Sequence, residues 1–489
     1  MVKVKKASNV LCCLNKKIIR STLDIKIVLM SLAVMFFSCL FQSIYLAITS
    51  LLMLFIALLC NILKDFKNKF VFFFFLISFF VFTMSQYFFG NINSEMYYSN
   101  FSNIVIIRTI FMQYLSLLAI YSSFYLAYFI QKKYLQKKDR IWKFKNTELI
   151  SLLLFIATII SLSFSIISNI DTAIRVFKYG YLEIYVSNHP SSLPHFIHYV
   201  GNSVIVFISL YLALAKTKKW IVFVLSFYFF NLIISIFAGG RSNFVIGIFY
   251  IIFYLLYYKY KFNIKRKVSL KKLILIVPTL LVLVIGLGMF NSIRSQVSIK
   301  NFNPLNEFNQ FFVDQGRSVN LISYAQIYKK EVRKKNTNYV FGPLLYSFEN
   351  KIEFLSFGNL KIRDIYSLNN QRKNNFAVDM TIYLLGLEQY EKGHGVGSQY
   401  IAELYIEYGY IGIVIFSLLL GVFVCLLNRY ITKNWLILSI LLLIFNSFVF
   451  MPRGQAMQII TSILSINFWG TILLLFIIDR IYSYFKKRV

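Results

Sequence analysis

Cysteine is rare in this chain, and its few copies are poorly placed for cross-linking. The five cysteines lie in the N-terminal segment or inside apolar runs, at Cys12, Cys13, Cys39, Cys60 and Cys425. A disulfide framework needs cysteines in exposed external segments, and a structural zinc site needs sets such as two CxxC pairs. The sequence therefore excludes both, and we interpret the adjacent Cys12 and Cys13 as incidental.

Several catalytic signatures are also missing. No GxSxG-like nucleophile anchor occurs, and the glycine-rich stretch 393–397 follows no predicted strand, which excludes a nucleotide loop. There are only four histidines: His189, His195, His198 and His394. The first three have no carboxylate or cysteine near them in sequence, so we expect no metal site there and no cofactor.

Charged residues are scarce as well, at 15% of the chain, whereas 58% of the residues are apolar. Apolar runs of about 18 residues or more recur, and this length crosses the hydrocarbon core of a bilayer. Such runs must be helices because lipid leaves no partner for unpaired backbone groups. We therefore predict an all-α polytopic integral membrane protein with about twelve transmembrane helices. The predicted spans are 27–44, 46–63, 70–89, 104–130, 147–169, 199–215, 220–238, 243–258, 273–290, 400–428, 435–451 and 455–479.

Lysine and arginine outnumber aspartate and glutamate by 52 to 19 and give a formal net charge of +33. Their clusters are separated from one another by pairs of apolar runs, which is the positive-inside pattern. This pattern predicts a membrane protein with both termini cytoplasmic, and the N-terminus has no small-residue cleavage site that would mark a removed signal. Because no folded domain presents the clusters, we expect no nucleic-acid partner. The clusters lie at 3–26, 64–69, 132–145, 216–219, 259–272, 429–433 and 480–488.

The predicted external side is uneven. The chain stays outside for roughly 110 residues before the last three helices, and external loops elsewhere have about 30 residues or fewer; a long ordered loop of this kind is typically a lid or a binding element. Within it, the pair Asn303 and Pro304 predicts a helix start, and Gln315 and Gly316 predict a break. The predicted regions are a cytoplasmic N-terminus (1–26), nine transmembrane helices (27–290), the large external loop (291–399), three transmembrane helices (400–479) and a basic tail (480–489).

Two carboxylates mark the point where this loop enters the next apolar helix. Glu403 and Glu407 are four residues apart, so on a helix they face the same side, with Tyr400 one turn earlier. Acidic side chains near a membrane face are costly unless they serve a function. We therefore regard both glutamates as candidates for catalysis, together with His394 in the preceding glycine run.

Three arginines on the predicted external side each stand beside glycine at a helix break, namely Arg241, Arg317 and Arg453. A guanidinium donates two parallel hydrogen bonds to a phosphate and keeps its charge at any working pH. The neighbouring Gly240 and Ser242 allow backbone and hydroxyl groups to join the first of these sites. The alternative is that the arginines only reach toward lipid headgroups. Arg294, which follows the predicted ninth span, belongs to the same candidate set.

These motifs, in their order along the C-terminal half, resemble the Wzy-type O-antigen and capsular polysaccharide polymerases. The resemblance rests on the stretch 395–405 with Tyr408 and Gly409, on 239–242, on 341–343 and on 452–454. It implies a metal-independent membrane glycosyltransferase without a cofactor, which joins polyprenyl-diphosphate-linked oligosaccharide repeat units in the bilayer and releases polyprenyl diphosphate. A polysaccharide chain-length regulator is a further partner that the resemblance implies.

Within this resemblance, Glu403 would be the general base, with Glu407 in reserve and His394 as a displaced candidate. The diphosphates would bind Arg241, Arg294, Arg317 and Arg453, and the supporting residues would be Gly240, Ser242, Ser398, Tyr400 and Tyr405. O-antigen ligases are an alternative, but their typical His-Asn pair would fall on Ser398 and Gln399 here. A lipid-linked oligosaccharide flippase or other transporter is an alternative of another class, which would typically have two similar halves.

Overall fold

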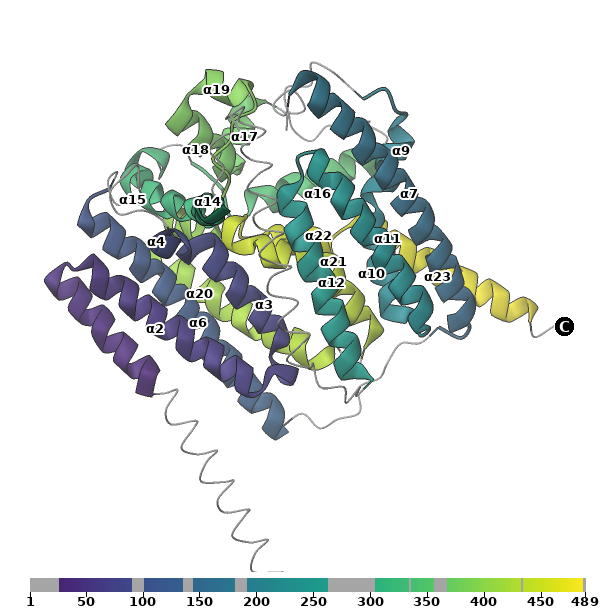
Figure 1. Ribbon diagram of the computed structural model, residues 1–489, viewed down its shortest axis with the longest axis horizontal. Helices are drawn as coiled ribbons and strands as arrows, with labels where there is room; N and C mark the ends of the chain where they lie inside the picture. The colour runs from purple at the N-terminus through teal and green to yellow at the C-terminus, as the bar shows by residue number, and fades with distance from the viewer. Residues whose placement is uncertain are drawn as a thin grey trace, which may run out of the picture.

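The structure is a computed structural model, and it describes residues 26–89, 101–134, 144–180, 191–262, 304–333, 336–355, 367–431 and 434–486. The described residues are mainly helical and include no strand. Figure 1 shows the long helices packed side by side and the shorter helices α14, α15, α17, α18 and α19 gathered at one end of them. The predicted all-α membrane fold is confirmed.

The helices follow the apolar runs closely. The N-terminal half contains α2 (Ile44–Lys64), α3 (Phe70–Phe79), α4 (Gln86–Phe89), α6 (Asn103–Tyr134), α7 (Thr147–Tyr179), α9 (His195–Asn202), α10 (Val204–Leu214), α11 (Lys218–Phe237) and α12 (Arg241–Lys261). The C-terminal half contains α14 (Pro304–Gly316), α15 (Asn320–Arg333), α16 (Gly342–Leu355), α17 (Leu368–Asn374), α18 (Phe376–Leu385), α19 (Leu387–Glu391), α20 (Tyr400–Tyr430), α21 (Trp435–Phe450), α22 (Gln458–Ile463) and α23 (Ile466–Phe485).

The twelve predicted spans are accounted for in three ways. Within the described residues, nine helical segments are long and apolar enough to cross a membrane. Two further predicted spans are shorter apolar helices, Lys26–Phe41 and Phe70–Met84, and the predicted span 273–290 lies outside the described residues. The first apolar stretch divides at Gln42 and Ser43, within a few residues of the predicted boundary between 27–44 and 46–63. The helix α14 begins at Pro304 and ends at Gly316 as predicted. The exact number of spans stays a prediction.

The long helix α20 is not continuous. Gly409 has φ 67° and ψ −154°, a conformation that glycine adopts readily and that strains residues with a β-carbon. The segment 400–408 is therefore set at an angle to the apolar segment 410–430. The predicted span 400–428 is thus found as a helical segment with a kink, which separates the two glutamates from the long apolar part of α20.

Below the kink, α20 packs closely on α6. A β-carbon built on Gly421 would overlap the carbonyl oxygen of Ile120 and the hydroxyl of Ser123. Since a helix backbone cannot yield to relieve such an overlap, this contact depends on glycine. The close approach fixes α20, and with it Glu403, relative to the N-terminal helices.

We therefore expect Gly421→Val to destabilise the protein by about 1–3 kcal/mol, the usual range for overpacking of a tight interior. The midpoint of thermal unfolding in detergent should fall clearly below that of the wild type. Gly470→Val is the matched control because nothing lies within 4 Å of a β-carbon at Gly470. Equal midpoints for the two variants would contradict the close packing of α20 on α6.

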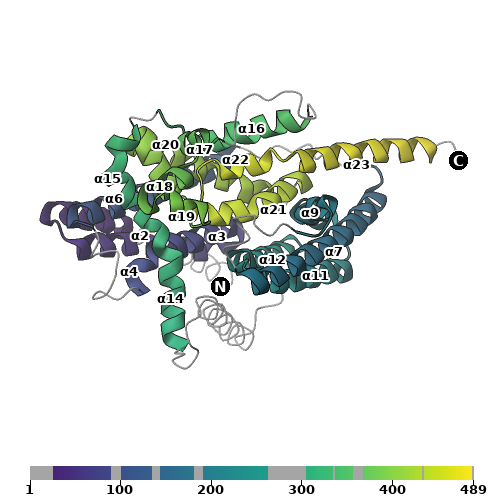
Figure 2. The same cartoon turned by 90° about the horizontal axis from the view of Figure 1, so that it is seen from above.

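Aromatic packing sets the direction of three central helices. The ring of Phe445 in α21 lies 4.8 Å from that of Phe253 and 5.7 Å from that of Tyr250, both in α12. The helix α3 continues to Met84, and we call Phe70–Met84 the α3 segment. Near its end, the ring of Phe82 lies 5.3 Å from that of Phe450, the last residue of α21. The start of α12, the end of α3 and the end of α21 therefore lie at the same end of the bundle as α14 to α19 (Figure 1). Figure 2 shows the same group from above, with α16 lying beside α22.

Candidate functional site

The centre of the candidate site is the carboxylate of Glu403, which is fully buried at 0% exposure. One oxygen accepts a hydrogen bond from the Ser398 hydroxyl at 2.6 Å, and the other accepts one from the backbone N–H of Ala456 at 2.9 Å. Ser398 belongs to the glycine loop before α20, and Ala456 belongs to the turn between α21 and α22. Glu403 therefore joins two segments that are more than fifty residues apart in sequence.

The first turn of α20 is held in place by polar contacts on both sides. The side chain of Gln399 caps the helix by accepting a hydrogen bond from the backbone N–H of Ala402 at 2.8 Å. The hydroxyl groups of Tyr400 and Ser116 in α6 are 2.6 Å apart, and Ser116 is 2.8 Å from Ser417. Tyr400 therefore anchors α20 to α6 and does not contact the Glu403 carboxylate.

Glu407 faces a different neighbour from Glu403. Its carboxylate accepts hydrogen bonds from the backbone N–H groups of Tyr339 and Val340, the second at 3.3 Å. Since a carboxylate that binds successive backbone donors fixes a turn, Glu407 fastens the segment before α16 to α20. The spacing of four residues led us to expect the two carboxylates on the same side of the helix. In the structure, each carboxylate accepts hydrogen bonds from a different segment.

An ion pair between a buried aspartate and a partly exposed arginine supports that same segment and was not predicted from the sequence. Asp379 in α18 is completely buried, accepts a hydrogen bond from the Tyr339 hydroxyl at 2.7 Å and pairs with Arg372 in α17 at 2.8 Å. Burial and the Asp379 carboxylate both raise the pKa of Tyr339, so its phenol stays protonated as a donor. Arg372 and Asp379 come from different helices, and only the spacing of seven residues could have suggested a pairing.

Arg453 and Arg317, two of the predicted phosphate-binding arginines, both contact side chains at the end of α14. Arg453, half-buried after α21, donates a hydrogen bond to the Gln315 side chain at 2.7 Å. Arg317 lies two residues beyond Gln315, is 63% exposed and pairs with Asp314 at 3.3 Å. The hydroxyl of the next residue, Ser318, donates to the carbonyl oxygen of Phe82, which fixes this turn on the end of the α3 segment.

Arg241, the third predicted arginine, begins α12 at the same end of the bundle as Arg453. Arg241 is the first residue of α12, nine residues before Tyr250, and Arg453 lies eight residues after Phe445, which packs on Tyr250. Because the two helices run in opposite directions and each residue rises about 1.5 Å, both arginines lie about 12–14 Å along the bundle from that contact. The side chain of Arg241, and all of Arg294, lie outside the described part of the chain.

The other predicted residues lie in the glycine loop, in α20 and at the start of α12. His394 is exposed in the glycine loop, where its backbone N–H donates to the carbonyl oxygen of Gln389 at 3.0 Å. The ring of Tyr405 lies 3.7 Å below the Lys329 ammonium group. Ser242 is exposed in the first turn of α12, next to Gly240, which precedes the helix. Among the predicted supporting residues, Ser398 is the one whose hydroxyl donates a hydrogen bond to Glu403 in the described part of the chain.

One member of the histidine group at 189, 195 and 198 makes contacts to serine. His198 lies between two serine hydroxyls, Ser168 at 2.7 Å from its Nδ1 and Ser191 at 2.8 Å from its Nε2. His189 lies outside the described residues. Across the described ranges, no group of three or more histidine, cysteine, aspartate or glutamate side chains is arranged to hold a metal ion.

Comparison with known proteins identifies one family. The family model described as O-antigen polysaccharide polymerase Wzy matches residues 23–487, almost the whole chain. No curated protein and no solved structure matches the chain. The match includes the N-terminal helices, whereas the sequence motifs that carry the resemblance lie in the C-terminal half.

Proposed function

Because the chain belongs to the O-antigen polysaccharide polymerase Wzy family and is a multi-pass bacterial membrane protein, we propose that Glu403 and the nearby arginines form its polymerisation site. Membership of the family supports the joining of lipid-linked O-antigen repeat units in the membrane. The observation that carries the proposal is the buried Glu403 carboxylate, held between the Ser398 loop and the turn that follows Arg453. The reaction would be a glycosyl transfer that releases polyprenyl diphosphate.

The proposed base acts through its serine neighbour. Glu403 is fully buried, and Ser398, whose hydroxyl donates to it, is 6% exposed. In our proposal the bound sugar contacts Ser398 and not the carboxylate. The acceptor sugar hydroxyl gives its proton to the Ser398 oxygen while Ser398 gives its own proton to Glu403. The freed acceptor oxygen then attacks the anomeric carbon of the donor, and the bond from that carbon to the diphosphate oxygen breaks. A single displacement of this kind inverts the anomeric configuration.

The diphosphate leaving group needs positive charge at the same level. Arg453 would bind it with the planar fork that suits phosphate oxygens, and Arg317 lies close enough in sequence to Gln315 to join it. The hydrogen bond from Arg453 to the side-chain amide of Gln315 orients the guanidinium. Arg241 and Arg294 stay members of this proposed set, and diphosphate needs no metal here to become a good leaving group.

The orientation of the chain follows from its basic clusters. We place both termini in the cytoplasm, which puts α14 to α19 and Glu403 at the external face of the membrane. Lipid-linked repeat units exposed at that face would reach the site from the bilayer. A chain-length regulator would act at the same face.

The test is the length of the surface polysaccharide in a strain that lacks this gene, resolved on a gel and compared with the complemented strain. We expect the deletion strain to display single repeat units on its surface and the complemented strain to display long chains. Accumulation of lipid-linked units on the cytoplasmic side would instead indicate a flippase and would overturn the proposal. A purified protein that polymerises lipid-linked units in vesicles would exclude that alternative directly.

A further inference from the structure

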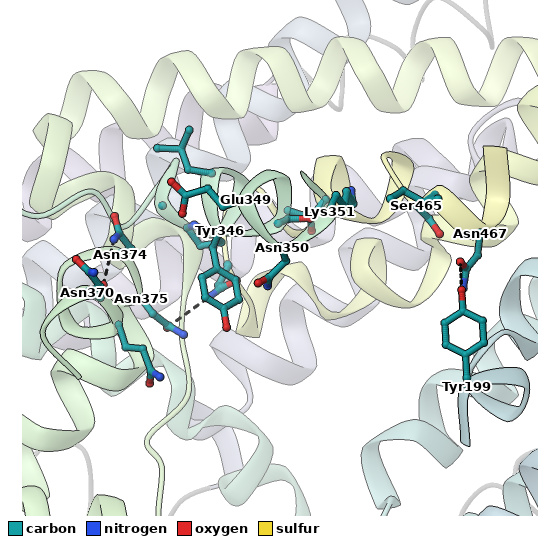
Figure 3. A pocket seen from close by; sticks show the side chains of 18 residues that line it. Tyr199, Tyr346, Glu349, Asn350, Lys351, Asn370, Asn374, Asn375, Ser465 and Asn467 are labelled. Atoms are coloured by element: carbon teal, nitrogen blue, oxygen red, sulfur yellow. Dashed lines mark hydrogen bonds between the residues drawn. The ribbon is translucent and has the colours of Figure 1, made fainter. Parts of the chain in front are cut away.

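A cavity of about 780 Å³ lies beside the proposed site, between α16, α17 and the turn that joins α22 to α23 (Figure 3). Seven of the 18 residues that line it are asparagine or glutamine, among them Asn350, Asn374, Asn375, Gln455 and Asn467. Its volume falls in the range of roughly 300–1,000 Å³ that is typical of sites for drug-sized ligands. The cavity can therefore hold a ligand of several rings rather than a single small ion.

The chemistry of the lining favours an uncharged ligand rich in hydroxyl groups. Each carboxamide offers two donors and an acceptor, and a sugar hydroxyl also donates and accepts. Among the described residues of the lining, Lys351 is the one cation and Glu349 the one anion, so the wall carries no net charge. Lys351 already donates to the carbonyl oxygen of Leu464 at 2.6 Å, and burial lowers its pKa. A phosphate group would find little to bind here.

Aromatic side chains complete a wall suited to sugar rings. Tyr346 extends from α16 into the same space as Asn350, and Tyr199 stands at the opposite end, where its hydroxyl donates to Asn467 at 2.8 Å (Figure 3). A sugar ring presents both an apolar face and polar edges, and tyrosine presents the same combination. The amides and tyrosines together therefore match a saccharide better than they match a lipid chain.

The cavity is linked directly to Glu403 through one turn. Gln455 lines the cavity and donates to the Asn375 side chain at 3.3 Å, while the next residue, Ala456, donates its backbone N–H to Glu403. A residue that lines the cavity thus directly precedes the residue whose backbone holds the proposed base. We infer that this cavity is the subsite that binds the uncharged sugar rings of a repeat unit, with Asn350 as a specificity-determining contact. This inference rests on the proposed function.

The experiment measures polymerisation by the full-length protein in vesicles with purified lipid-linked repeat units from the strain that carries it. Asn350→Ala should raise KM about tenfold and leave kcat unchanged, because it removes a hydrogen bond of about 1.4 kcal/mol from binding alone. Ser347→Trp, which fills the cavity from α16, should raise KM at least as much. Asn309→Ala is the matched control, since Asn309 is exposed on α14 away from the cavity, and its KM should equal that of the wild type.

Two inhibitors identify which part of the substrate the cavity holds. The repeat-unit oligosaccharide without its lipid should inhibit the wild type competitively and inhibit Asn350→Ala about tenfold more weakly, whereas a short-chain polyprenyl diphosphate should inhibit both equally. Unchanged KM in both cavity variants, or weaker inhibition by the diphosphate alone, would overturn the inference while wild-type polymerisation kept the proposed function intact. Failure of the wild type to polymerise would instead refute the proposed function before any variant was compared.

Discussion

Glu403→Gln should lower kcat for polymerisation by about 10²–10⁴-fold, the usual contribution of a general base. Glutamine has nearly the same shape as glutamate and can still accept the hydrogen bond from Ala456, so the turn after Arg453 should stay in place. It cannot take a proton from Ser398, and the proposed relay therefore stops. The measurement is the rate of chain growth in vesicles, with protein abundance determined from the same membranes.

The control for this variant is Glu391→Gln, which removes a charge from an exposed position on α19. It should polymerise at the wild-type rate. A Glu403→Gln protein that is stable and retains a wild-type kcat would exclude Glu403 as the base, and the exposed His394 would then become the first residue to test. Loss of protein in the membrane would instead show that the carboxylate mainly holds the two segments together.

Arg453→Lys should raise KM for the lipid-linked repeat unit by about 10–100-fold, which corresponds to the loss of a charged hydrogen bond of roughly 1.5–3 kcal/mol. Lysine keeps the positive charge but lacks the planar fork that binds two phosphate oxygens at once. The substitution also removes the geometry that lets Arg453 contact Gln315. The quantity to measure is KM in the vesicle assay, together with the inhibition constant of a short-chain polyprenyl diphosphate.

Arg480→Lys provides the comparison because Arg480 is exposed in α23 and lies in the basic cluster that we place in the cytoplasm. Its KM should not change. If Arg453→Lys bound the diphosphate as tightly as the wild type, Arg453 would have no role in the phosphate site. The remaining assignment would then depend on Arg241, Arg294 and Arg317.

These two substitutions and the cavity variants test different steps of substrate binding and reaction. Glu403→Gln changes proton transfer, Arg453→Lys changes binding of the diphosphate, and Asn350→Ala changes binding of the sugars. The three effects should appear in different constants: kcat for the first, KM and diphosphate inhibition for the second, and KM and saccharide inhibition for the third. A single structural defect would change all of them together.

The sequence alone determined the class of the protein and the positions of most of its helices. Long apolar runs have one stable solution in lipid, a helix, and proline and glycine mark the ends of helices by their backbone preferences, as at Pro304 and Gly316. The carboxylate pair at Glu403 and Glu407 and the arginines beside glycine could be singled out because charge is costly in such surroundings. The resemblance on these motifs also led to the family that the family model confirms.

Which of these residues come into contact depends on long-range packing. Glu403 is bonded to Ala456 across more than fifty residues, Arg453 to Gln315 across more than a hundred, and Arg372 to Asp379 across two helices. Such contacts depend on how helices dock, and docking depends on close approaches such as that of Gly421 to Ile120, for which the sequence carries no local pattern. The same holds for the amide cavity: the asparagines at 370, 374 and 375 are visible in the sequence, but their common space with Tyr346 and Gln455 arises from the packing of α16, α17 and α22. The local sequence pattern determines where each helix lies, whereas the docking of helices determines which side chains form a site.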